Sequence, residues 1–99
     1  MHQLRPQVVL PVAGELDVHG VTAAHKQLLE LVLAPGDQLV LDLSAVTFMD
    51  STGIRLILQA REHALRNGAG FVLVRGPQPV MRVLELVGLD AQLDIVAQI

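Results

Sequence analysis

The sequence predicts a small α/β domain in which helices pack against a largely parallel β-sheet. Short apolar runs rich in Val and Leu alternate with longer segments whose apolar residues recur every three or four positions, and Gly or Pro separates the two kinds of segment. Strands that alternate with helices pair in parallel through right-handed crossovers. We therefore expect about four strands, in a parallel or mixed sheet, and about three helices in one domain over residues 1–99.

The first half of the chain is predicted to hold two main strands and one helix. Residues 1–6 are compatible with a weak first strand. Residues 8–14 form a β-branched run whose proline indicates an edge strand or a bulge. Apolar residues recur at helical spacing over 21–32, and the Ala-Pro-Gly at 34–36 would end that helix. Leucines alternate with other residues over 38–44, which is typical of a strand.

The second half continues the alternation. Residues 52–66 are predicted to form a helix, and the Asn-Gly pair that follows it suits a left-handed C-terminal cap. The apolar run 71–74 predicts a strand that is buried on both faces. Residues 77–88 predict a helix with a proline in its first turn, and its buried stripe is expected to include Val87. The tail from Leu89 onward is expected to pack against the body and to add a short strand.

Composition narrows the function classes. The 99 residues carry a net charge of −3 and include two Phe but no Tyr or Trp. Nucleic-acid modules need basic footprints and aromatic platforms, so we expect no nucleic-acid partner. Cysteine is absent, which excludes disulfides, thiolate metal ligands and a thiol nucleophile.

The apolar segments are short. No run approaches the 18 residues that indicate a membrane span, so no direct membrane insertion is expected. The N-terminus also lacks the charged start and long apolar centre of a signal peptide. These features predict a cytoplasmic protein.

Polar side chains gather after the first two main strands. "GELDVHG" (14–20) and "SAVTFMDSTG" (44–53) are predicted as loops at the carboxyl ends of these strands, where parallel sheets place their functional residues. The second loop puts Asp50, Ser51 and Thr52 at the start of the 52–66 helix.

These segments resemble a STAS domain, and within that family a bacterial anti-sigma factor antagonist. "GELD", "LVLDLSAVTFMDSTG" and "GAGFVLVRGPQPVMRVLELVGLD" occur in the family's order, and the resemblance runs from about Val8 to Val96. It implies that Ser51, directly after the acid, is phosphorylated by a partner that is both an anti-sigma factor and a serine kinase. A phosphoserine phosphatase would reverse the reaction. The implied partner-binding residues are Glu15, Asp17, Met49, Asp50, Ser51, Thr52, Gly53 and Arg55.

The chemistry of a phosphoryl group is consistent with such a switch. Phosphorylation adds about −1.5 to −2 charges, which the dipole and free N–H groups of a helix N-terminus tolerate. A partner would have to desolvate this group beside Asp50. At about 5 Å and an effective dielectric near 20, a like-charge pair costs on the order of 3 kcal/mol, or about a hundredfold in affinity.

Each singled-out residue also has a plainer interpretation. Ser51 could serve only as a helix cap. Thr52 could be an ordinary residue of the first helical turn, and its functional alternative is a second phosphate acceptor. Gly53 could let another chain approach or could satisfy tight packing. Asp17 could be an ordinary cap or turn residue. Arg55, together with Arg61 and Arg66, could face a partner or could be solvated.

Two further functional alternatives remain open. One is a non-phosphorylated STAS subunit of a lipid-transport ATPase complex, and the other is a signalling scaffold. Catalysis is not expected, because Ser51 lacks a nearby His and the G-x-S-x-G motif, and "GAGF" enters a strand where a phosphate loop would open a helix. No cofactor is expected either, since ATP and Mg²⁺ would belong to the partner kinase.

Overall fold

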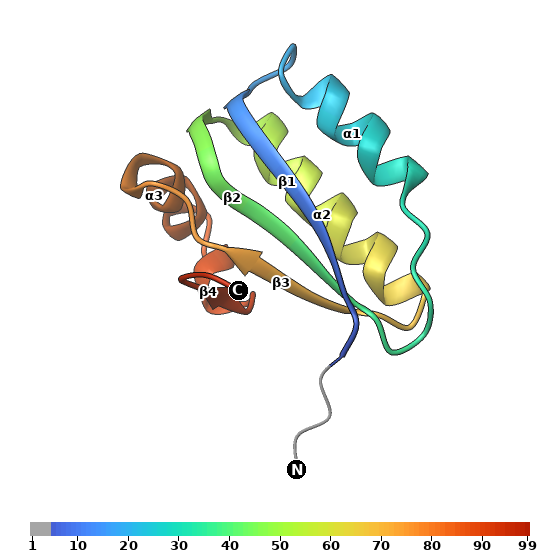
Figure 1. The fold of residues 1–99 in the computed structure, drawn as a ribbon. Helices are drawn as coiled ribbons and strands as arrows, with labels where there is room; N and C mark the ends of the chain where they lie inside the picture. Colours follow the sequence, from blue (N-terminus) through green and yellow to red (C-terminus); the bar gives the residue numbers. More distant parts are fainter. Residues whose placement is uncertain (1–4) are drawn as a thin grey trace.

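The computed structural model describes residues 5–99 and confirms the predicted α/β class (Figure 1). Three helices and four strands alternate along the chain, and a short 3₁₀ helix, η1, precedes the last strand. In chain order the elements are β1 (Gln7–Leu16), α1 (Val21–Glu30), β2 (Gln38–Met49), α2 (Ser51–Arg66), β3 (Gly70–Val74), α3 (Gln78–Leu86), η1 (Leu89–Ala91) and β4 (Ile95–Val96). The weak strand suggested at 1–6 falls mostly outside the described residues, and Arg5 and Pro6 precede β1 without joining the sheet.

The four strands form one parallel sheet in the order β1-β2-β3-β4. Each neighbouring pair is linked through a helix, as expected for parallel crossovers (Figure 1). The register pairs Leu16 with Met49, the last residues of β1 and β2. The loops that leave these two strands therefore begin side by side, and the Asp50 N–H donates to the Leu16 carbonyl at 3.5 Å.

A single apolar core joins the sheet to all three helices. β2 contributes the fully buried Leu39, Leu41 and Leu43, and α2 contributes Leu56 and Ile57, which are equally inaccessible. Full burial of one such side chain stabilises the fold by about 1.5–3 kcal/mol. The two elements on either side of the Asp50–Ser51 junction are thus both anchored in the core.

β2 is longer than predicted and ends at Met49, so most of the expected 44–53 loop is strand. The pairing of β1 with β2 shifts register near Pro11, as predicted, and again between Gly14 and Glu15. These shifts interrupt strict alternation, so Val46 and Met49 are buried while the two residues between them are exposed. The period-two pattern is lost for that reason, although pairing with β1 continues.

Two helices end earlier than predicted. α1 stops at Glu30, and Leu31 is already extended with ψ of 131°. As a result Val32, which the helical spacing had included in this helix, lies outside it and is 88% exposed. α3 stops at Leu86, which leaves Val87 exposed, contrary to prediction. Gly88 then takes a positive φ of 77°, a conformation that suits glycine after a helix.

Candidate functional site

The site is built around the junction between β2 and α2. Asp50 has an extended backbone, and its carboxylate accepts a hydrogen bond of 2.8 Å from the Thr52 N–H. Its carbonyl accepts from the Gly53 N–H at 3.0 Å. Asp50 is therefore the N-cap of α2, and Ser51 is the first helical residue. The interpretation of Ser51 as the cap is wrong.

Ser51 is exposed at the start of this helix. Within residues 5–99 its hydroxyl makes no hydrogen bond, since the capping role belongs to Asp50. The hydroxyl lies at a helix N-terminus, where the helix dipole favours an added negative charge. The N–H groups of Thr52, Gly53 and Ile54 are already bonded to Asp50. A phosphoryl group here would meet solvent and would not disturb the core.

Gly53 is buried and packs against the ends of β1 and β2. A Cβ on Gly53 would overlap the Met49 side chain and lie 3.1 Å from the Leu16 Cβ. Met49 itself is only 3% exposed. The structure thus favours tight packing for Gly53. Met49 is buried and Gly53 has no side chain, and their contact holds the start of α2 against the ends of β1 and β2.

Asp17 organises the neighbouring loop between β1 and α1. Its carboxylate accepts from the Gly20 N–H at 2.8 Å and from the His19 N–H at 3.1 Å. The hydrogen bond from Gly20 is the main cause that lowers the pKa of Asp17 below its usual value. Glu15 is exposed and pairs in register with Phe48 on β2. The predicted turn role of Asp17 is therefore present at the same edge of the sheet as Ser51.

A shallow hollow lies beside the junction, between α1 and α2. It measures about 230 Å³ and is lined by Val21, Thr22, His25, Thr52, Arg55 and Gln59. Small-molecule sites usually occupy roughly 300–1,000 Å³, so this hollow is smaller than a usual ligand site. No group of three or more His, Cys, Asp or Glu residues in the described part of the chain could hold a metal ion.

Two exposed apolar side chains at this edge were not anticipated. Val18, in the loop after β1, is 66% exposed, and Phe48, near the end of β2, is 49% exposed. The exposure of Phe48 depends on the irregular register of β2. Sequence periodicity could not have shown it, because alternation alone does not reveal where a bulge shifts the buried face.

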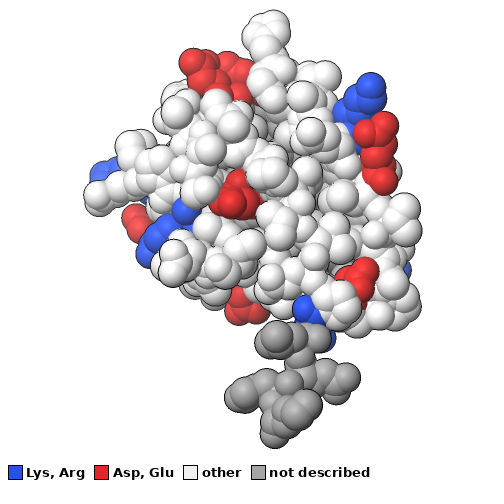
Figure 2. Space-filling view, viewed as in Figure 1, with Lys and Arg blue, Asp and Glu red and all other residues white. Residues whose placement is uncertain are grey.

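The three arginines of α2 do not form one basic face. Arg55 and Arg66 are exposed and eleven residues apart, about three helical turns, whereas Arg61 is half-buried on another side. Figure 2 shows acidic and basic side chains scattered among uncharged ones, with no basic patch on the face in view. Among the three, only Arg55 lies within the hollow beside Thr52.

The fold and the junction define a small α/β domain that displays an exposed serine at the start of a helix packed on the sheet. The family model of the STAS domain matches residues 1–99, so the chain belongs to the STAS domain family. In the described residues no helix has the length and apolar character needed to cross a membrane.

Individual relatives are similar to this chain at modest identity. It is 34% identical over 82 residues to the anti-sigma-F factor antagonist RsfB of two Mycobacterium tuberculosis strains, CDC 1551 / Oshkosh and ATCC 25618 / H37Rv. This match covers 83% of the chain and 66% of each relative, so the chain spans just under two thirds of their length.

Two solved structures of anti-sigma factor antagonists are similar to this fold. An anti-sigma factor antagonist from Mycobacterium paratuberculosis superposes with a TM-score of 0.82 at 26% identity, over 99% of this chain and 83% of the other. The anti-sigma factor antagonist SpoIIAA in its unphosphorylated form gives a TM-score of 0.71 at 21% identity, over 98% and 85%. At that identity the second likeness supports the fold alone.

Proposed function

We propose that this protein is an anti-sigma factor antagonist that works as a phosphorylation-controlled binding switch. Its unphosphorylated form would bind an anti-sigma factor with serine kinase activity and so release a sigma factor for transcription in the cytoplasm. Phosphorylation of Ser51 would break the complex, and a phosphoserine phosphatase would restore it. The similarity to anti-sigma factor antagonists supports the class of partner.

One observation carries the proposal: Asp50 caps α2, which leaves Ser51 exposed with an unused hydroxyl. A serine that served as the cap would lose a structural hydrogen bond on modification. Here the modification would change the surface and leave the fold intact, as a reversible switch requires.

The proposed partner surface surrounds this hydroxyl. The residues that a docking protein could reach lie at the end of β1, in the two loops and in the first two turns of α2. They are Glu15, Asp17, Asp50, Thr52 and Arg55. Met49 and Gly53 would act indirectly, because their packing fixes the position of α2 relative to β1 and β2. A dianion on Ser51 would be desolvated beside Asp50 on docking, which is the proposed source of the loss in affinity.

The protein itself would perform no chemistry in this scheme. The partner kinase would supply ATP and Mg²⁺ and place the γ-phosphate against the Ser51 hydroxyl. The Ser51 side chain would form the new O–P bond and lose its proton, and ADP would leave.

A pull-down with two baits tests the proposal. Ser51→Ala should recover a histidine-kinase-like ATPase from the source cell's extract, and Ser51→Asp should not. Ser44→Ala is the matched control, because it removes the hydroxyl of another exposed serine, on β2 and outside the proposed surface, and should behave as the wild type. Recovery of lipid-transport ATPase components by both Ser51 baits would contradict the switch and favour a permanent structural subunit.

A further inference from the structure

Arg55 lies one helical turn after Ser51 on α2. Side chains at positions i and i+4 of a helix share a face, with their Cβ atoms about 5–6 Å apart. Both residues are exposed. Among residues 5–99 the one ion pair joins Glu62 to Arg66, so Arg55 pairs with no acid in this part of the chain. The nearby Asp50 carboxylate is engaged by the Thr52 N–H.

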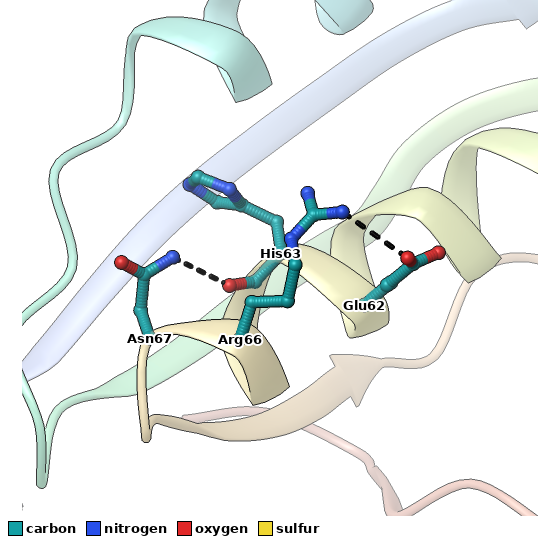
Figure 3. Close-up of polar contacts among 4 residues, drawn as sticks. All are labelled: Glu62, His63, Arg66 and Asn67. Atoms are coloured by element: carbon teal, nitrogen blue, oxygen red, sulfur yellow. Dashed lines mark hydrogen bonds and ion pairs between the residues drawn. The ribbon is translucent and has the colours of Figure 1, made fainter.

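The same helix already forms an ion pair of this geometry. Glu62 and Arg66 are also four residues apart, with the acid on the N-terminal side, and their Oε1 and Nη1 atoms are 3.1 Å apart (Figure 3). Both side chains remain largely exposed, at 66% and 64%. This pair therefore needs no burial to form on α2.

Phosphoserine has nearly the reach of glutamate. Its terminal oxygen is three bonds from Cβ (through Oγ and P), as the carboxylate oxygen of glutamate is through Cγ and Cδ. A phosphate on Ser51 could therefore reach Arg55 in the same way as the Glu62 carboxylate reaches Arg66. It would also present three acceptor oxygens to a guanidinium, a strong and directional pairing.

We propose that Arg55 is the intramolecular counter-ion of phosphorylated Ser51, so that phosphorylation withdraws the positive charge of Arg55 from the partner surface. This inference rests on the proposed function. Modification would then act twice at one surface, since it adds a dianion beside Asp50 and removes an arginine that a carboxylate of the partner could bind. The change at the interface would be larger than the phosphate alone produces.

Other charged and titratable groups share this region. Asp50 directly precedes Ser51, Asp17 lies on the adjacent loop, and His25 of α1 lines the same hollow as Arg55. All three are retained in the variants below, so their effect on the phosphate is common to every protein compared.

The test uses protein that carries phosphoserine at position 51, introduced during translation, and measures the second pKa of the phosphate by ³¹P NMR. The comparison is between the wild type, Arg55→Gln and Arg82→Gln, where Arg82 is an exposed arginine of α3. We expect Arg55→Gln to raise the phosphate pKa by about 0.5, because the dianion loses its counter-ion. Arg82→Gln should leave it unchanged.

Equal phosphate pKa values in all three proteins would overturn the inference. The measurement needs neither the kinase nor the partner, so the ion pair and the binding switch can fail separately. Should Arg55→Gln shift the pKa while the Ser51 baits recover the same proteins, the ion pair would stand and the binding switch would fall.

Discussion

At the residue scale, the β2–α2 junction assigns different tasks to neighbouring positions. Asp50 caps the helix, Ser51 displays an unbonded hydroxyl, and Gly53 packs against Met49 and Leu16. Because cap and hydroxyl belong to different residues, the stability of α2 and the chemistry of Ser51 can be changed separately.

The capping role of Asp50 predicts a simple pair of variants. Asp50→Ala removes the acceptor for the Thr52 N–H and should lower the free energy of unfolding by about 1 kcal/mol in urea denaturation. Asp50→Asn keeps a side-chain oxygen and should remain close to the wild type. An Asn variant as unstable as the Ala variant would show that charge, and not the hydrogen bond, stabilises this helix end.

The packing of Gly53 predicts a second effect on stability. Gly53→Ala places a methyl group against Met49 and should lower the free energy of unfolding by about 1–3 kcal/mol. The same substitution should cost much less in a Met49→Ala background, where the space is open. Additive effects, within about 0.5 kcal/mol, would contradict a direct clash between these two residues.

At the scale of elements, β1 and β2 are followed by similar hydrogen-bonded turns. An aspartate after each strand accepts hydrogen bonds from the N–H groups that come next, Asp17 from Gly20 and Asp50 from Thr52. The parallel register holds the two turns side by side at one end of the sheet. A partner that contacts one loop would therefore meet the other as part of the same rigid surface.

The Asp17 loop should respond to acid. Its hydrogen bonds lower the folded-state pKa beneath the unfolded value of about 3.9, so the folded protein binds fewer protons in this range. The stability that Asp17 contributes is therefore present above about pH 4 and is lost as the pH falls through the folded-state pKa. A carboxyl NMR titration should place the Asp17 midpoint below 3.9.

An exposed acid without such hydrogen bonds offers a control for stability. Asp17→Asn should make thermal unfolding less dependent on pH between about pH 5 and pH 3, whereas Asp90→Asn, on η1, should change it less. An Asp17 midpoint at or above 3.9 would contradict the proposed role of the Gly20 N–H.

At the scale of the whole molecule, the alternation of strands and helices predicted about four strands in a largely parallel or mixed sheet and about three helices. The sheet has four strands, all parallel, and three helices pack on it. Element ends were less predictable, because tertiary contacts decide them. β2 continues to Met49 through irregular pairing with β1, and Leu31 leaves the helical path where the His63 Nε2 lies 3.1 Å from its carbonyl oxygen. The pattern of apolar residues in the sequence indicates neither the end of β2 nor the end of α1.

For the candidate site too, some features were predictable from the sequence and others were not. Ser51 was placed at the helix start from local residues, since an acid, a hydroxyl and a glycine precede an apolar helix. Which residue caps the helix depended on the backbone of Asp50, and the burial of Met49 and Gly53 depended on how α2 lies against β1 and β2. These are properties of the assembled fold.

The most direct measurement is the affinity of the unphosphorylated and the Ser51-phosphorylated protein for the kinase recovered with the Ser51→Ala bait, by isothermal titration calorimetry. A like-charge penalty on the order of 3 kcal/mol predicts binding about a hundredfold weaker for the phosphorylated form. Equal affinities would show that Ser51 is not a switch, however well its surroundings suit a phosphate.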